Sequence, residues 1–180
     1  MTRLQLEHII RASAATADVR DIVVIGSQAI LGTYPNAPAE LTQSLEADVF
    51  PRDLPDRSIV IDGSIGELSL FHETFGYYAH GVGESTAILP DGWRDRLVRL
   101  ENSNTPGAVG WCLEAHDLAI SKLAAGREKD MDYVLAMIRS RLTSVEVLRE
   151  RLAMATGLPA SQRELAVARL SVWSRVCENE

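Results

Sequence analysis

Residues 22–50 read IVVIGSQAILGTYPNAPAELTQSLEADVF, and the fold can be worked out from this stretch. Four apolar residues open it and predict a short buried strand. Gly26-Ser27 follows at once, with Ser27 expected as the N-cap of a small helix from about Gln28 to Gly32, where the glycine is a natural stop. Two prolines within YPNAPA then interrupt any helix or ladder and predict a loop. The stretch therefore begins as strand, turn and short helix.

A second strand is predicted over residues 45–50, where apolar and acidic side chains alternate. Leu45, Ala47 and Val49 are expected to face the core, which leaves Glu46 and Asp48 on the other face. Side chains two apart on a strand lie roughly 7 Å apart. Two carboxylates on a rigid element suit Mg²⁺, which takes one or two protein carboxylates plus phosphate oxygens and water. A Gly-Ser turn at a strand end offers backbone N–H groups to phosphate, so the two halves predict a metal–nucleotide site.

Gly26-Ser27 followed by Glu46-x-Asp48 resembles the nucleotidyltransferase superfamily that includes DNA polymerase beta. Within it, the chain is most similar to the AbiEii and MenT-type nucleotidyltransferases of bacterial toxin–antitoxin and phage-defence systems, and to related uncharacterised bacterial proteins. Two features depart from the family pattern. Eighteen residues separate Ser27 from Glu46, and the first acid is Glu with no arginine just before it. The resemblance implies a nucleotidyltransferase fold with Glu46 and Asp48 as Mg²⁺ ligands and Gly26 and Ser27 as nucleotide-binding residues.

A second part of the resemblance lies in SKLAAGREKD, near residue 126. Gly126 is expected to end one helix and Arg127 to start the next, so that Lys122, Arg127 and Asp130 converge at one edge of the sheet. A lysine is a compact charge suited to a β- or γ-phosphate. The resemblance implies that Lys122 binds the triphosphate and that Asp130 orients Lys122 or the incoming hydroxyl. Arg127 is expected to bind the nucleotide as well. Asp132, on the same turn, is the alternative to Asp130 for the second acid of this segment.

The segment 53–67 carries conflicting signals. Ile59, Val60 and Ile61 are β-branched and favour a strand, whereas Ile61, Ile65 and Leu68 recur at helical spacing. A helix is the preferred interpretation. As a strand, the segment would offer Asp62 as a third carboxylate.

An aromatic block at 69–80 predicts a short helix ending at Gly76 and then a strand. His72 and His80 have no metal-ligand spacing, so packing or surface roles are expected for them. The alternative is that Tyr77, Tyr78 or His80 lines the base or acceptor pocket. The residues alone leave both interpretations open.

Further strands are predicted at 86–89, 96–100 and 109–113, separated by strong turn compositions. Together with the earlier strands they predict an α/β (α+β) fold with a mixed sheet of about five strands flanked by helices. Residues 1–113 form the expected nucleotidyltransferase core, and residues 114–180 form a helical C-terminal part packed on it. The two last helices are expected at about 143–157 and 159–176. The apolar stripe of the last helix would pack on the hairpin or on a partner subunit, and it consists of Leu165, Ala168, Val172 and Val176.

Composition narrows the function classes. The chain has 180 residues, 46% of them hydrophobic, which is enough for a core, and its formal net charge is −7. This balance argues against a protein that coats nucleic acid through a broad basic face, although Arg94, Arg96 and Arg99 form a small basic cluster. The two cysteines, Cys112 and Cys177, have no ligand spacing. No apolar run approaches the ~20 residues of a membrane span, so a cytoplasmic location is expected.

The sequence thus predicts an Mg²⁺-dependent enzyme that transfers a nucleoside monophosphate from an NTP to an acceptor hydroxyl. The resemblance makes the tRNA 3′ end the first acceptor to test, and a toxin paired with a cognate antitoxin protein the first biological role. Small-molecule or protein acceptors stay open, as does a catalytically silent relative that binds a nucleotide or a partner. The oligomeric state is not predicted.

Overall fold

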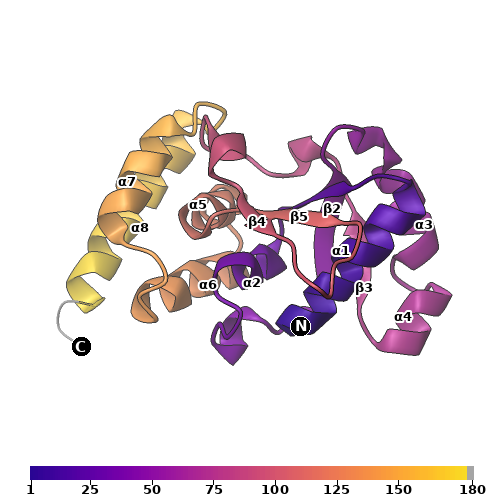
Figure 1. Cartoon of the computed structure of the whole chain (residues 1–180). Helices are drawn as coiled ribbons and strands as arrows, with labels where there is room; N and C mark the ends of the chain where they lie inside the picture. Colours follow the sequence, from indigo (N-terminus) through magenta and orange to yellow (C-terminus); the bar gives the residue numbers. More distant parts are fainter. Residues whose placement is uncertain (178–180) are drawn as a thin grey trace. The chain divides into compact units, whose positions relative to one another are not determined.

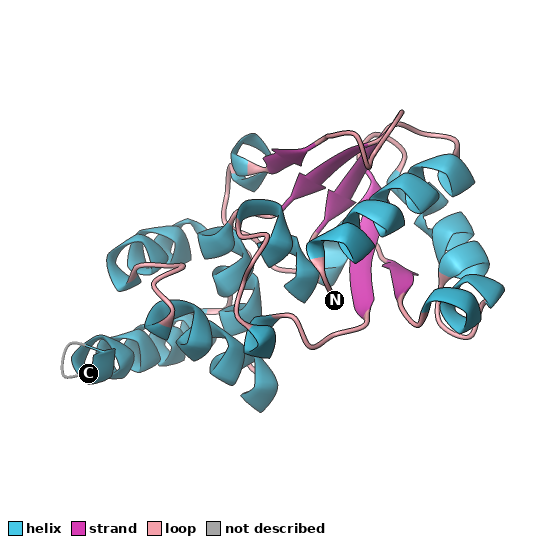
Figure 2. Cartoon of the chain, turned by 60° about the horizontal axis from the view of Figure 1, so that its bottom comes forward, coloured by secondary structure: helices cyan, strands magenta, loops and turns pink. Residues whose placement is uncertain are grey.

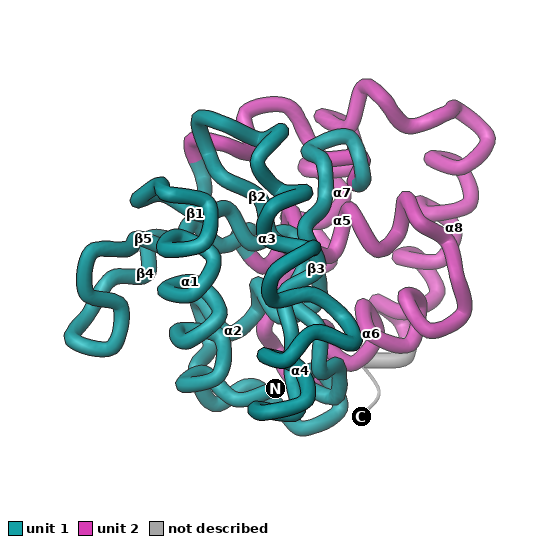
Figure 3. The backbone as a smooth tube through the Cα atoms, turned by 90° about the vertical axis from the view of Figure 1, so that its right-hand side faces the viewer, with its two compact units in different colours: residues 1–86, 96–114 teal, residues 87–95, 115–180 magenta. Residues whose placement is uncertain are grey.

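A computed structural model describes the backbone of residues 1–177 and the side chains of residues 1–175. The chain divides into two compact units (Figure 3), and each is described by itself. Unit 1 comprises residues 1–86 and 96–114, and unit 2 comprises residues 87–95 and 115–180. No helix within the described residues is long and apolar enough to cross a membrane. The side chain of Cys177 lies outside the described set.

Unit 1 contains all five strands and the helices that flank them (Figure 1). In chain order its elements are α1 (Arg3–Ala17), β1 (Asp21–Val24), η1 (Ser27–Ala29), α2 (Ile30–Thr33), η2 (Ala39–Leu41), β2 (Glu46–Pro51), η3 (Pro55–Arg57), α3 (Ser58–Ile65), α4 (Leu70–Phe75), β3 (Tyr78–Gly81), η4 (Glu84–Thr86), β4 (Val98–Leu100) and β5 (Val109–Cys112).

The five strands form one mixed sheet (Figure 2). Their order is β3-β2-β1-β5-β4. β1 pairs with β2 antiparallel and with β5 parallel. β3 runs parallel to β2, and β4 runs antiparallel to β5. The predicted mixed α/β architecture is confirmed, as is the helix rather than a strand over residues 58–65.

One face of this sheet is covered by α1, α2 and α3. The pairing row Cys112, Val24, Val49 and Gly81 crosses four strands and therefore points to a single face. At this face a Cβ on Gly32 of α2 would lie 2.4 Å from the Cβ of Cys112, and one on Gly81 would lie 2.0 Å from the Ser58 carbonyl oxygen of α3. α1 meets the same face at Gly110, where an added Cβ would lie 2.5 Å from Ile10 Cδ1. Glycine thus permits the close approach of helix and sheet.

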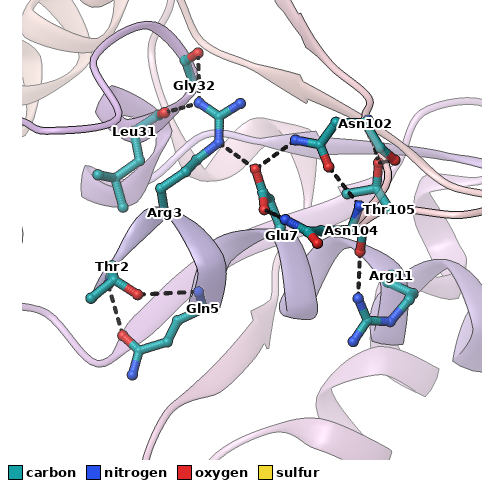
Figure 4. A network of polar contacts seen from close by, with 10 residues as sticks. All are labelled: Thr2, Arg3, Gln5, Glu7, Arg11, Leu31, Gly32, Asn102, Asn104 and Thr105. Carbon is teal, nitrogen blue, oxygen red and sulfur yellow. Dashed lines mark hydrogen bonds and ion pairs between the residues drawn. The ribbon is translucent and has the colours of Figure 1, made fainter.

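A buried carboxylate fixes the start of α1 within unit 1 (Figure 4). Glu7 is 3% exposed and accepts hydrogen bonds from Arg3 Nε at 2.9 Å and from the side-chain amides of Asn102 at 2.8 Å and Asn104 at 2.9 Å. Arg3 Nη1 also donates to the carbonyl oxygens of Leu31 and Gly32 at the end of α2. Burial opposes ionisation, yet these donors hold the pKa of the Glu7 carboxyl below its usual value. The network ties α1 to α2 and to the loop before β5.

We expect Glu7→Gln to lower the free energy of unfolding by about 1–3 kcal/mol, because its amide group would face buried donors and leave one of them unsatisfied. Urea denaturation at neutral pH measures this loss. Glu40→Gln, at an exposed acid in η2, is the matched control and should change stability little. Equal stabilities of the two variants would contradict a role for the network.

Unit 2 is a helical bundle. Its elements are η5 (Trp93–Arg96), at the point where the chain passes back to unit 1, and α5 (Ala115–Ala125), α6 (Glu128–Arg139), α7 (Val145–Met154) and α8 (Ala160–Cys177). The predicted hairpin is confirmed: α5 ends at Ala125, the following Gly126 has a φ of 71°, the left-handed conformation that glycine favours, and α6 begins at Glu128. Leu118 and Leu123 of α5 and Val134 of α6 are buried.

Several local predictions are wrong. Residues 86–89 form no strand: Thr86 ends η4 in unit 1, and residues 87–89 belong to unit 2, where Ile88 lies beside Gly157, shortly after α7. Gly26, rather than Ser27, occupies the N-cap position of η1, and α2 continues through Gly32 to Thr33. Leu45 is 53% exposed.

The predicted stripe of α8 is also wrong. Leu165, Ala168 and Val172 are exposed, and the helix buries Ala166 and Leu170 instead. The side chain of Val176 lies outside the described set.

Candidate functional site

The two acids of β2 lie on the sheet face opposite α1. Ala47 and Val49 are fully buried, so the alternation places Glu46 and Asp48 together on the other face, as predicted. The Asp48 side chain is 25% exposed. Because β2 lies between β3 and β1 in the sheet, both carboxylates extend from a backbone that is paired on its two sides.

Gly26 lies against Asp48. The Ile25 amide donates to the Asp48 carbonyl at 3.0 Å, which brings the end of β1 beside the acid. A Cβ on Gly26 would lie 1.9 Å from Asp48 Oδ2, closer than any pair of non-bonded atoms can approach. Gly26 and the Asp48 carboxylate are therefore in direct contact, an arrangement that would suit a metal-bound phosphate at this turn.

β3 supplies a polar partner to each carboxylate. The parallel register sets Tyr78 opposite Glu46 and His80 opposite Asp48. The Tyr78 hydroxyl donates to Glu46 Oε2 at 3.1 Å, and His80 Nδ1 lies 2.9 Å from Asp48 Oδ1. Burial, the hydrogen bond to Glu46 and the nearby acids raise the pKa of Tyr78 to about 12, so its hydroxyl stays a donor at neutral pH.

A cavity of about 220 Å³ opens beside these strands, lined by Glu46, Asp62, Glu67, Tyr78 and His80. Asp62 reaches it from α3, where its Oδ1 accepts a hydrogen bond from the Gly81 amide at 3.2 Å. Asp62 is therefore not on a strand, yet it shares the cavity with Glu46. The lining is predominantly acidic.

Among the described residues, no group of three or more His, Cys, Asp and Glu side chains has a geometry that could hold a metal ion by itself. The donor set of Glu46 and Asp48 nevertheless fits Mg²⁺, which commonly takes one or two carboxylates and fills its remaining positions with water and substrate phosphates. The contact between Asp48 Oδ2 and Gly26 points the acid toward the turn at which phosphate would lie.

A second charged cluster lies in unit 2, at the turn between α5 and α6. Asp130 is 1% exposed and lies 3.4 Å from Lys122 Nζ. Arg127 grips the same carboxylate with two hydrogen bonds, Nε to Oδ2 at 2.6 Å and Nη2 to Oδ1 at 3.2 Å. The structure thus brings together the three predicted residues of this segment, while Asp132 is exposed. Lys122 also lies 5.3 Å from the centre of the Tyr133 ring.

The environment of Asp130 should make the stability of the protein depend on pH in the acid range. Burial opposes its ionisation, but the hydrogen bonds from Arg127 and the charge of Lys122 hold its pKa below the ordinary 3.8. A carboxyl with a lowered folded-state pKa stabilises the protein above its unfolded pKa and loses that contribution as the pH falls through the folded value.

We expect Asp130→Asn to cost about 1–3 kcal/mol of unfolding free energy at pH 7, and the difference from the unmodified protein to shrink below about pH 4. Urea denaturation across pH 3–7 measures both. Asp132→Asn, on the exposed face of the same helix, is the control. A difference that does not change with pH would contradict the role assigned to the Asp130 charge.

The remaining predicted residues have other roles. His8 Nδ1 lies 2.7 Å from the Tyr77 hydroxyl, which holds Tyr77 beside α1 and out of the cavity lining. His72 Nδ1 accepts the Leu68 amide at 3.1 Å, a local turn contact. Arg99 pairs with Glu101. Sequence reasoning missed Glu67, because no local pattern links it to Glu46.

The sequence of the chain matches the model of a family described as nucleotidyltransferase of unknown function (DUF6036) over residues 4–178. No curated protein and no solved structure matches it. The resemblance to nucleotidyltransferases is therefore supported at the level of the superfamily, and the narrower likeness to AbiEii and MenT-type toxins stays a prediction.

Proposed function

Because the chain belongs to this nucleotidyltransferase family, we propose that it transfers a nucleoside monophosphate from an NTP to an acceptor hydroxyl. The observation that supports the proposal is the contact of Gly26 with Asp48, which brings the turn after β1 against one acid of β2 within one unit. Glu46 and Asp48 are the proposed Mg²⁺ ligands, and Gly26 and Ser27 the proposed phosphate-binding residues.

In the proposed reaction the acceptor oxygen forms a bond to the α-phosphorus. The bond from that phosphorus to the bridging oxygen breaks, pyrophosphate leaves with the electron pair, and the hydroxyl proton is released to solvent. A bound Mg²⁺ would neutralise charge that develops on the transferred and leaving groups. The chain's own contribution is orientation: β2 holds two carboxylates on one face, and the turn after β1 holds phosphate oxygens against them.

Lys122, Arg127 and Asp130 are proposed as a further phosphate-binding element. Two cations surround one carboxylate, so the cluster carries one net positive charge, and the Lys122 side chain is only 12% exposed. Asp130 would then fix the lysine rather than react. Lys122→Ala should raise the KM for the NTP more than it lowers kcat if this role is correct.

The acceptor is proposed in two forms. Resemblance to MenT-type proteins favours the tRNA 3′ end. The acidic lining of the cavity favours a small molecule or a protein, since Glu46, Asp62 and Glu67 would repel the phosphates of an RNA backbone. A small acceptor with hydroxyl and amino groups fits that lining better than a polyanion.

The test incubates the full-length protein with each of the four α-³²P-labelled NTPs, Mg²⁺, and three acceptor pools: total tRNA, proteins, and small molecules of a cell lysate. Label is expected in one acceptor pool, and no label is expected in a control reaction in which EDTA chelates the Mg²⁺. Label in the tRNA pool would select the first acceptor form, and label in either other pool the second. No transfer to any pool, together with unchanged NTP affinity in Asp48→Ala, would leave the catalytically silent relative as the better description.

A role as a toxin has its own test. Expression in a bacterial host should stop growth, and a co-expressed neighbouring gene product should relieve the arrest if that product is an antitoxin. If a host that expresses the unmodified protein grows as fast as one that expresses Asp48→Ala, the toxin role is ruled out. The proposal of nucleotidyl transfer would not be affected by that result.

A further inference from the structure

We propose that β3 is the orienting element of the site, with Tyr78 positioning Glu46 and His80 positioning Asp48 for metal binding. This inference rests on the proposed function, and it assigns a role to two side chains that lie outside the metal-ligand pair. Both contacts cross from β3 to β2 between residues that the parallel register sets directly opposite each other.

Each β3 side chain contacts one oxygen of its carboxylate and leaves the second oxygen available for a metal ion. Tyr78 takes Glu46 Oε2 and His80 takes Asp48 Oδ1. The second oxygen of Asp48, Oδ2, is the atom that lies against Gly26. An ionised carboxylate can only accept, so the imidazole must carry its proton on Nδ1 to make this contact. This contact holds Asp48 with its Oδ2 directed at the Gly26-Ser27 turn.

Stability alone gives no strong reason for the histidine contact. His80 is 49% exposed and Asp48 25% exposed, and ion pairs at such exposure contribute little to folding. A carboxylate beside solvent turns readily about its side-chain bonds, and a rigid partner on the neighbouring strand removes that freedom. Outer partners of metal ligands have this effect, and their loss typically costs 10–100-fold in metal affinity or activity.

The test measures Mn²⁺ binding by electron paramagnetic resonance, with the full-length protein and a non-hydrolysable NTP analogue. We expect His80→Ala to weaken Mn²⁺ binding about 10–100-fold while its melting temperature stays near that of the unmodified protein. His80→Asn is the conservative variant, because its amide nitrogen can donate from near the Nδ1 position, and it should recover most of the loss. His80→Gln places its amide farther out and should not.

Tyr78→Phe tests the other arm, since it removes only the hydroxyl that donates to Glu46. It should weaken Mn²⁺ binding and lower kcat more than it raises the KM for the acceptor. Asp48→Ala separates the two levels of the proposal. If Asp48→Ala binds Mn²⁺ as well as the unmodified protein, the metal site itself is wrong. If it loses Mn²⁺ while His80→Ala and Tyr78→Phe keep it, only the orienting role of β3 is overturned.

Discussion

Asp48→Ala is expected to lower the rate of nucleotidyl transfer by about 10³-fold. A metal that polarises a phosphoryl group supplies several kcal/mol of charge stabilisation in the transition state, and each 1.36 kcal/mol is a factor of ten in rate. Asp48 contacts both Gly26 and the β3 histidine, His80, so its removal should affect ligand geometry and charge together. Single-turnover transfer from a labelled NTP measures the loss.

Asp48→Asn is the companion variant, because the amide keeps the size of the side chain and removes its charge. It should be nearly as inactive as Asp48→Ala, and both should unfold within a few degrees of the unmodified protein, since the side chain is partly exposed. Full activity in Asp48→Asn would show that the charge is not needed and would remove Asp48 from the proposed metal ligands.

Gly26→Ala is expected to reduce transfer by about 10²-fold through one methyl group. The added Cβ would lie 1.9 Å from Asp48 Oδ2, so the carboxylate must move or the turn must open. Misplacement of a reacting group by about 1 Å can cost 10²-fold in rate. The loss should appear in kcat and in Mn²⁺ affinity, measured on a protein whose circular dichroism spectrum is unchanged.

Gly63→Ala is the matched control, because the same methyl group added inside α3 meets nothing within 4 Å. This variant should keep its activity and gain about 0.5–1 kcal/mol of stability, since alanine is the better helix former. Equal activity of Gly26→Ala and the unmodified protein would contradict the contact between the turn and the acid.

The elements that carry the site could be predicted where local patterns were unambiguous. Alternation in 45–50 placed Glu46 and Asp48 on one face, and Gly126 marked the turn that brings Lys122 to Asp130. Around Asp62 the signals conflicted; the preferred helix is confirmed, although it ends at Ile65 and leaves Leu68 exposed. In each case the signal lay within a few neighbouring residues, which is the range over which side-chain periodicity is informative.

Other features depend on contacts that no local pattern encodes. The α8 helix has apolar residues on two faces, Leu165 with Val172 and Ala166 with Leu170, so spacing alone could not select the buried one. Glu67 joins Glu46 only through the packing of α3 beside β3. The apolar run predicted as a strand at 86–89 is too short to show a period, and residues 87–89 belong to the helical unit 2.

The pairing of β2 with β3 limits how this protein can vary. A shift of β2 by one residue would turn its acids toward α1 and expose Ala47 and Val49, which are fully buried. A one-residue insertion or deletion within β2 would therefore prevent folding, and selection would remove it for that reason, whatever its effect on catalysis. The buried residues of β2 thus preserve the spacing of the two acids. Sequence variation within this family should therefore occur as substitutions on the acidic face and as length changes in the loops.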